Sequence, residues 1–484
     1  MSTIPAQPNA AAISPEAPVV GARPGHHGAP TIAARIDRLP PSKTVRNMVI
    51  LLSLGGLFEF YDLFLTTYIA PGLFKSGVFT ATTKGLFGFE GIASFVAALF
   101  LGLWVGTLFV SWLSDRYGRR VVYTWALLWY CIATLIMAFQ HTAMSIDIWR
   151  FIASIGIGLE MVNIDTYVSE LAPQAKRGTY FALNQFITFS AVPVVAFLGW
   201  LLVPHQIAGL DGWRWVAIFG ALGAIVIWFI RLRLPESPRW LEDKGRHHAA
   251  DAILSRIEQR VERETGRPLP EPKAFVGDVD PVKPRWGEMW EGVYRKRTVM
   301  LILFNILQTV GYYGFASWAP TYLIAKGFDI PKSLLYTFII AFAYPISSLI
   351  GASFGDRFER KWLIAVPALG VALFGLLFAN ANGATAIIVF GIAVAFFNNI
   401  MSYAYHAYQS ELYPTRIRAR AVGFVYSFSR ISAVFSGFVI ADLLKTSGDV
   451  GVFTFIAAAM VGVALVIVIM GPRVTKRRLE DIAR

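Results

Sequence analysis

Long runs of apolar residues dominate the chain and fall into two sets of six. The first set lies at 47–70, 91–113, 121–140, 146–168, 180–202 and 214–232; the second lies at 298–320, 333–355, 362–380, 384–408, 420–443 and 451–471. Each run approaches the length of about 20 residues with which a helix crosses the hydrocarbon core of a bilayer. The pattern predicts an all-α integral membrane protein with twelve transmembrane helices in two six-helix halves.

The composition agrees with this pattern. Of the 484 residues, 55% are hydrophobic and 15% are charged, whereas a soluble chain has roughly 45–50% apolar and about 25% charged residues. A soluble protein of two or three domains is therefore excluded. We expect a disordered cytoplasmic tail at 1–44, a six-helix half at 45–232, a cytoplasmic loop with short helices at 233–296 (one near 249–264), a second six-helix half at 297–471 and a cytoplasmic tail at 472–484.

The basic residues give the chain a net charge of +13 and lie mostly in alternate loops. If both termini are cytoplasmic, 36 of the 44 lysines and arginines face the cytoplasm, as the positive-inside rule expects. Six of the others lie in loops on the opposite side or at their edges, and the remaining two, Arg150 and Arg430, lie inside helices. The charge therefore predicts orientation in a bilayer, of bacterial inner-membrane type, and not a nucleic-acid surface. The single cysteine, Cys131, excludes an intrachain disulfide.

An internal repeat joins the two sets of spans. The run Asp115-Arg116-Tyr117-Gly118-Arg119-Arg120 follows the second span, and 241 residues later Asp356-Arg357-Phe358-Glu359-Arg360-Lys361 follows the eighth. The same offset carries Glu170, Pro173 and Arg177 onto Glu411, Pro414 and Arg418. The two halves are therefore predicted to be homologous and to lie in parallel orientation, an arrangement found among membrane carriers.

At these residues the sequence resembles the major facilitator superfamily, over the whole membrane part of the chain. Three segments resemble its sugar-porter and organic-ion or metabolite:proton symporter branch: Glu170–Gly178, Pro235-Glu236-Ser237-Pro238-Arg239-Trp240-Leu241 and Glu411–Arg418. The resemblance implies secondary transport by alternating access. Two positions depart from the superfamily pattern, because Ser111 and Glu359 stand where glycine is usual.

Charges beside the helix ends form a candidate cytoplasmic gate. Partly hydrated ion pairs between neighbouring helix ends are weak enough to break in each transport cycle. We expect such a latch, chiefly from the resemblance, although the same charges could serve only to set topology. The candidate residues are Asp115, Arg116, Arg119, Arg120, Glu170, Arg177, Asp356, Arg357, Glu411 and Arg418.

Ionisable residues inside spans are costly and usually functional. Asp62 in the first span and Arg150 in the fourth are predicted to pair, and the resemblance implies the same of proton-coupled sugar porters. An aspartate beside an arginine stays ionised, and it takes a proton when the arginine leaves and burial dominates. A static ion pair that only fixes packing is the alternative. Glu59 or Glu160 could carry the proton instead.

Arg430, in the eleventh span, is the candidate substrate-binding charge. A guanidinium keeps its proton when buried, so Arg430 needs a counter-charge or a wet cavity. A substrate carboxylate is one solution; a static pair with the acids of the first span is the other. Polar side chains expected to orient the substrate are Gln185, which matches a sugar-porter glutamine, and Asn305, Gln308, Tyr312, Tyr313, Asn398 and Tyr403. His406 is expected to be a packing residue.

These observations predict a proton-coupled symporter of a small organic solute, an organic or aromatic carboxylate in our preferred interpretation. A sugar or organic-cation transporter of the same fold is the alternative, and a membrane receptor without transport is a weaker one. No cluster of nucleophile and base or of metal ligands occurs, and no phosphate-binding glycine loop, so we expect no enzyme, metal or cofactor. The expected partners are the solute, protons and the lipid bilayer, with the chain as a monomer.

Overall fold

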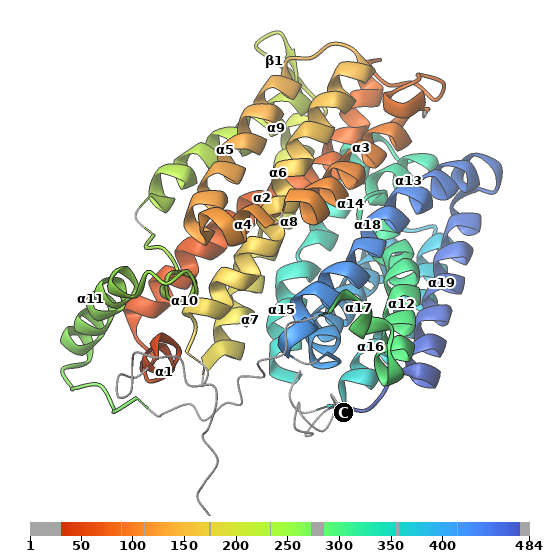
Figure 1. Cartoon of the computed structure of the whole chain (residues 1–484). Helices are drawn as coiled ribbons and strands as arrows, with labels where there is room; N and C mark the ends of the chain where they lie inside the picture. The colour runs from red at the N-terminus through yellow and green to blue at the C-terminus, as the bar shows by residue number, and fades with distance from the viewer. Residues whose placement is uncertain are drawn as a thin grey trace, which may run out of the picture.

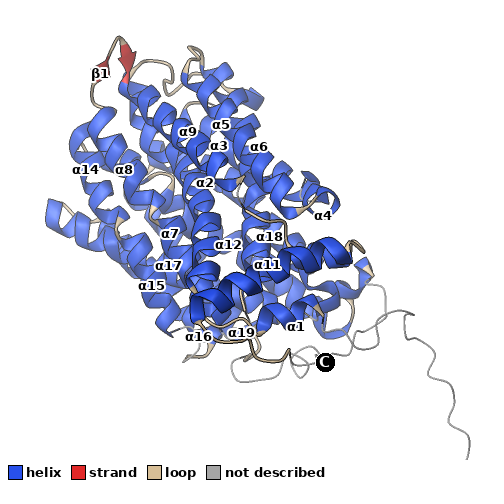
Figure 2. Ribbon diagram, turned by 90° about the vertical axis from the view of Figure 1, so that its left-hand side faces the viewer, coloured by secondary structure: helices blue, strands red, loops and turns tan. Residues whose placement is uncertain are grey.

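The computed structural model describes residues 31–88, 90–110, 112–173, 176–232, 234–272, 285–354, 358–413 and 415–474. Helices from the two halves form two neighbouring bundles (Figures 1 and 2). The first half comprises α2 Lys43–Lys75, α3 Ile92–Val105, the π-helical turn η2 Gly106–Val110, α4 Trp112–Tyr117, α5 Arg119–Ala138, α6 Ala143–Leu171, α7 Arg177–Phe189, α8 Ala191–Leu202 and α9 Gly212–Arg231.

The second half repeats this order of long helices. It comprises α12 Gly292–Ala316, α13 Ala319–Ala325, α14 Ile330–Ala341, α15 Ala343–Phe354, α16 Arg360–Ala379, α17 Ala384–Glu411, α18 Thr415–Thr446 and α19 Gly448–Met470. Ten described spans are long and apolar enough to cross a membrane, and α3 is a shorter apolar helix. With α6, which is 29 residues long and carries several charges, they complete two sets of six. The predicted all-α membrane fold is confirmed.

Two spans are each broken into two helices near their middle. The fifth is broken at Ser190, between α7 and α8, and the eighth at Phe342, between α14 and α15. Pro345 lacks the N–H that would bond back to residue 341, so the second break follows from the sequence. The breaks meet across the two halves, where the rings of Phe189 and Tyr344 stack with centroids 6.1 Å apart.

The halves contact one another through α3 with α18 and through α7–α8 with α14–α15. We call the end of the molecule that carries α1 and α11 the base, and the opposite end, with the strands Gln206–Ile207 and Leu210–Asp211, the top (Figure 1). Near the top, Thr67 donates a hydrogen bond to Ala316 O of the other half at 3.1 Å. Trp200 stacks on Phe338 with centroids 6.0 Å apart. These two contacts hold the halves together near the top, in addition to the helix pairs named above.

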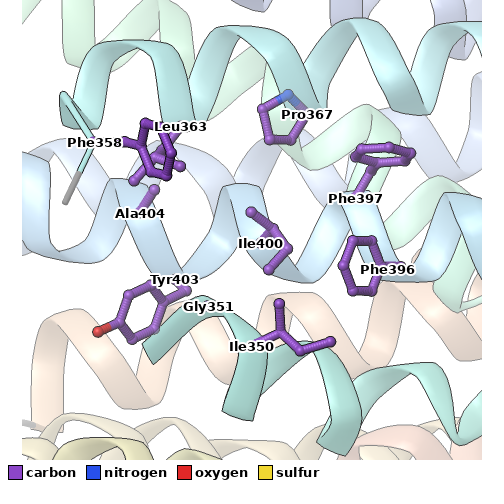
Figure 3. Close-up of a pocket in the computed structure, with 10 residues that line it drawn as sticks. All are labelled: Ile350, Gly351, Phe358, Leu363, Pro367, Phe396, Phe397, Ile400, Tyr403 and Ala404. Carbon is purple, nitrogen blue, oxygen red and sulfur yellow. The ribbon is translucent and has the colours of Figure 1, made fainter. Parts of the chain in front are cut away.

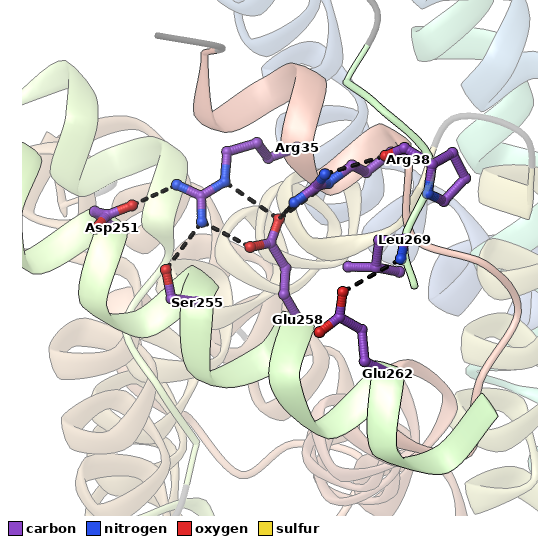
Figure 4. Close-up of polar contacts among 8 residues, drawn as sticks. Arg35, Arg38, Asp251, Ser255, Glu258, Glu262 and Leu269 are labelled. Carbon is purple, nitrogen blue, oxygen red and sulfur yellow. Dashed lines mark hydrogen bonds and ion pairs between the residues drawn. The ribbon is translucent and has the colours of Figure 1, made fainter. Parts of the chain in front are cut away.

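Short helices gather at the base of the first half. The central loop forms α10 Pro238–Asp243 and α11 His247–Thr265, which confirms the helix expected near 249–264. Residues Ile32–Asp37, in the stretch expected to be a disordered tail, form α1. Arg35 of α1 and Arg38, which follows it directly, bind Glu258 of α11 at 2.7 Å each (Figure 4). These partners lie some 220 residues away, so the order of α1 depends on tertiary contacts.

Candidate functional site

Asp62 of α2 and Arg150 of α6 form a buried ion pair. Arg150 Nη1 donates to Asp62 Oδ2 at 2.9 Å, and Arg150 Nη2 donates to the backbone oxygen of Asp62 at 2.5 Å. Arg150 is 0% and Asp62 4% exposed. The sequence prediction of this pair agrees with the geometry. Burial on this scale means that neither charge is hydrated, so each depends on the other.

A third residue completes this site and was missed in the sequence. Thr134 of α5 donates its hydroxyl hydrogen to Asp62 Oδ1 at 2.9 Å, so both carboxylate oxygens of Asp62 are hydrogen-bonded. A hydroxyl inside the apolar run 121–140 was the available signal, but such hydroxyls also bond within their own helix, as Thr124 does to Arg120 O.

Small residues allow α6 to lie close enough for this pairing. A Cβ at Gly158 would collide with the backbone of Leu103 in α3, and one at Gly102 would lie 2.5 Å from Phe151 O. A Cβ at Gly156 would lie 2.9 Å from the Trp129 ring of α5. These glycines therefore let α6 pack closely against α3 and α5. Glu59 of α2 and Glu160 of α6 are also buried, at 1% and 0% exposure.

Arg430 lies midway along α18 and is 1% exposed. Its guanidinium donates to the hydroxyl of Tyr313 at 2.6 Å, to the hydroxyl of Tyr426 at 3.0 Å and to Met161 Sδ of α6 at 3.4 Å. Among the side chains that the structure describes, no carboxylate forms a salt bridge with it. Hydroxyls solvate Arg430 but do not neutralise it. The alternative considered from the sequence, a static pair with the acids of the first span, is not formed among the described residues.

Amide side chains lie on the two helices beside Arg430. Asn305 and Gln308 of α12 are buried, and Asn398 of α17 donates to Gly311 O at 3.3 Å, which joins these two helices. The Oδ1 atoms of Asn305 and Asn398 accept no hydrogen bond within the described residues. Tyr312 lies edge-on to Tyr313 with centroids 5.0 Å apart. These groups offer acceptors and aromatic edges on α12 and α17, two helices that contact α18.

Two other predicted substrate residues lie apart from this cluster. Gln185 is half-buried on α7 of the first half. Tyr403 lines a cavity of about 270 Å³ between α15, α16 and α17 (Figure 3). The other nine residues that line this cavity are apolar: Ile350, Gly351, Phe358, Leu363, Pro367, Phe396, Phe397, Ile400 and Ala404. A cavity without charge does not suit an ionic substrate, so the cluster around Arg430 remains the candidate substrate site.

Residues of the predicted gate form two equivalent ion pairs, the second of them with Arg360, which the sequence analysis quoted only as part of the repeat. Arg119 Nε lies 3.3 Å from Glu170 Oε1 at the base of the first half, and Arg360 Nε lies 2.8 Å from Glu411 Oε2 at the base of the second. Both residues of one pair are offset by 241 from those of the other. The repeat in the sequence is therefore also a repeat in the contacts.

The other gate residues have varied surroundings. Arg120 donates to Leu232 O at 2.6 Å, Arg418 donates to Tyr413 O at 3.3 Å, and Arg116 is exposed beside Tyr117. The side chains of Asp115 and Arg177 are not described, and Asp356 and Arg357 lie outside the described residues.

Glu236, quoted above only as part of a motif, has a clear structural role. Its Oε1 accepts from the backbone N–H of Arg120 at 3.0 Å and from that of Ser237 at 2.9 Å, so it caps the start of α5. Gly118 precedes that start with a φ of 110°, and a Cβ there would lie 2.5 Å from Glu236 Oε2. Glycine is needed here both for the backbone conformation and for the space.

Comparison with known proteins agrees with this geometry. Residues 48–484 match the family described as "Sugar (and other) transporter". The chain is 33% identical over 450 residues to the "Putative metabolite transport protein YyaJ" of Bacillus subtilis, with 92% of this chain and 96% of that protein covered. It is 27% identical over 452 residues to the "Niacin transporter NiaP" of Acinetobacter baylyi, with 93% and 99% covered.

A solved structure gives the same fold. The structure described as "Partially occluded inward open conformation of the xylose transporter XylE from E. coli" superposes with a TM-score of 0.72 at 21% sequence identity. The match covers 90% of this chain and 100% of that one. At this identity the likeness concerns the architecture of the two bundles and not the solute.

Proposed function

Because the chain belongs to the sugar (and other) transporter family, we propose that it is a proton-coupled symporter of a small organic carboxylate. The observation that carries the proposal is Arg430, a buried cation whose donors reach, among the residues that the structure describes, only tyrosine hydroxyls and a thioether. A guanidinium cannot lose its proton to escape burial. A bound carboxylate would neutralise it, and the planar fork of an arginine suits two carboxylate oxygens.

The remaining groups of the cluster would orient the rest of the solute. The unused Oδ1 atoms of Asn305 and Asn398 accept from donor groups such as hydroxyls, and the edges of Tyr312 and Tyr313 pack against apolar or aromatic parts. The relative described as a niacin transporter supports an organic acid. The relative described as "Arabinose-proton symporter" of Bacillus subtilis supports proton coupling and keeps a sugar as the second candidate.

Coupling would use the pair of Asp62 and Arg150. While Arg150 and Thr134 bind the carboxylate, Asp62 stays ionised. Loss of the arginine contact leaves a buried carboxylate, which then takes a proton. Binding of the proton in one orientation of the carrier and its release in the other would move the solute with the proton gradient.

We further propose that the base faces the cytoplasm of a bacterial inner membrane, with both termini on that side. The support is the distribution of basic residues, of which 36 of 44 then lie inside. The ion pairs of Arg119 with Glu170 and of Arg360 with Glu411 would then hold helix ends together at the cytoplasmic face.

Uptake of labelled solutes into proteoliposomes, with the outside acidified, tests the proposal. We expect accumulation of a carboxylate that a protonophore abolishes, with no accumulation of a neutral sugar or an amine. Weak acids also enter as neutral molecules, so liposomes without protein and liposomes with Arg430→Ala protein are the controls. Accumulation of a sugar or an amine while carboxylates are ignored would reject the carboxylate, and accumulation that is insensitive to the protonophore would reject proton coupling.

A further inference from the structure

Asp147 is a buried carboxylate outside the sites described above. It lies in the first turns of α6 near the top and is 0% exposed. Its Oδ2 accepts from the backbone N–H of Leu86 at 2.9 Å, at the start of the 3-10 turn η1 Leu86–Gly88. A Cβ at Gly85 would collide with this carboxylate and with Ser94. The connection between α2 and α3 therefore packs directly against Asp147.

Asp147 lies one helical turn from Arg150 on the same helix. Residues three apart on a helix lie on one face, with about 4.5 Å of axial rise between them. In this conformation Arg150 is turned to Asp62 and forms no salt bridge with Asp147 within 4.0 Å. Among the described residues, Asp147 Oδ1 accepts no hydrogen bond and Arg150 Nε donates none. Each group thus has an unused site toward which the other can turn.

The charged groups around Asp147 are few. The helix α6 contributes Arg150 and, three turns deeper, Glu160. The helix α2 contributes Asp62, Glu59 one turn below it, and Lys75 at its top end, which is exposed. The α2–α3 connection contributes Lys84 and Glu90, which are exposed, and α3 contributes no charged residue. The helix α5 carries charges only at its base, and its titratable residues nearer the top are Tyr130 and the buried Cys131. Arg150 is therefore the one buried cation on these described elements that can neutralise Asp147.

We infer that Arg150 exchanges between two aspartates during proton uptake, binding Asp62 while that residue is ionised and Asp147 while Asp62 carries a proton. The inference rests on the proposed coupling at Asp62. It adds that Arg150 moves to Asp147 when it leaves Asp62. The balance is simple: Asp62 gains one proton, and Arg150 keeps its charge and changes its anionic partner. A buried arginine without any carboxylate partner is thereby avoided at each step.

The exchange also connects the proton to the top of the molecule. Asp147 holds η1 through the Leu86 amide, so a carboxylate that turns toward Arg150 loosens that bond. Protonation of Asp62 would then weaken the hydrogen bond that holds the α2–α3 connection to α6. Proton binding at Asp62 would thus loosen the α2–α3 connection at the top, although Asp62 and the connection do not touch.

Asp147→Asn tests the inference, because an asparagine retains an acceptor for the Leu86 amide and removes only the charge. Without Asp147, Arg150 stays with Asp62, which then binds a proton less readily. We expect the pH profile of proton-driven uptake to move toward lower pH by about one unit, with exchange of labelled for unlabelled solute retained. Asp147→Glu, which keeps the charge, should restore the wild-type profile.

Asp211→Asn is the matched control at the top, since Asp211 pairs with Arg214 at 3.7 Å in a less buried hairpin. It should leave the profile unchanged. A wild-type profile in Asp147→Asn, or the same profile in Asp147→Asn and Asp147→Glu, would overturn the inference. Asp62→Asn in the same assay separates this result from failure of the proposed function, because accumulation by Asp62→Asn would reject coupling at Asp62 itself.

Discussion

Each half of the molecule contains one buried arginine inside a span, and the two arginines have different partners. In the first half Arg150 has the carboxylate of Asp62 and the support of Thr134. In the second half Arg430 has two phenol hydroxyls and a sulfur atom. The repeat offset of 241 carries Arg150 onto Gly391 and Arg430 onto Phe189, so neither charge belongs to the shared scaffold.

This difference suggests a division of labour between homologous halves. In the first half, Arg150 is neutralised by Asp62, so a proton that removes the charge of Asp62 changes the interactions of Arg150. An arginine that has no carboxylate partner within the described part of the chain contributes a site that attracts an anion from outside the protein. Ion pairs that do belong to the scaffold, those of Arg119 with Glu170 and Arg360 with Glu411, are instead the same in both halves.

The largest expected effect comes from removing the charge of the second half. Arg430→Ala should lower carboxylate uptake efficiency by at least about 30-fold, as for truncation of a buried charge partner. Arg430→Lys should weaken apparent affinity less, and Tyr426→Phe, which removes one supporting hydroxyl, should weaken it least. Initial rates over a range of solute concentrations measure this order. Equal uptake by Arg430→Ala and wild type would mean that Arg430 only packs α18.

Removing the negative charge of the first half should separate coupling from binding. Asp62→Asn should reduce accumulation against a gradient to background, while exchange of solute across the membrane continues. The proton site is lost but the cluster around Arg430 is intact. Counterflow and proton-driven uptake in the same vesicles measure the two activities. Continued accumulation would mean that Glu59 or Glu160, and not Asp62, carries the coupling proton.

A smaller change beside the same ion pair should shift the pH dependence of uptake without abolishing it. Thr134→Val removes the hydrogen bond to Asp62 Oδ1 and so favours the protonated carboxyl, which should move the pH profile of uptake toward higher pH by up to about one unit. Thr124→Val, on the same helix with its hydroxyl bonded to Arg120 O, is the matched control. Thr134→Ser should restore the wild-type profile. Identical profiles for Thr134→Val and wild type would make Thr134 a packing residue.

The scaffold pairs should give a symmetric and modest result. Glu170→Gln and Glu411→Gln should each slow turnover by less than about fivefold, as expected for partly exposed ion pairs. Solute affinity should change little, because both pairs lie at the base. Rates and affinities in the two variants measure the symmetry. Wild-type turnover in both variants would leave these charges with a role in topology alone.

The smallest effect should appear at the base of the first half. Although burial alone would raise it, hydrogen bonds from Arg35 and Arg38 hold the pKa of Glu258 below its ordinary value of 4.5. Docking of α1 is therefore favoured above pH 4.5 and is lost as the pH falls through the lowered pKa. Hydrogen exchange of α1 and α11 should accelerate at acid pH while α12 stays protected. Glu258→Gln should remove most of that pH dependence.

Part of the site could be anticipated because it depends on positions along the chain. Asp62 and Arg150 are charged residues inside apolar runs, and Arg119, Glu170, Arg360 and Glu411 share one repeat offset. Thr134, Met161 and Glu236 could not be assigned in this way. A threonine or methionine in an apolar run is ordinary, and only the neighbouring helix reveals that its hydroxyl or sulfur meets a buried charge.

The sequence by itself determined the membrane class, the twelve spans, the two homologous halves and the charges that a bilayer makes expensive. These features depend on hydrophobic length and on the cost of burying charge, which any chain in a bilayer must obey. The tertiary structure decided which charges meet. It brought the Thr134 hydroxyl to Asp62, left Arg430 to tyrosine hydroxyls and placed Tyr403 at an apolar cavity. Such contacts depend on the rotation and closeness of packed helices, and periodicity along one chain does not specify either.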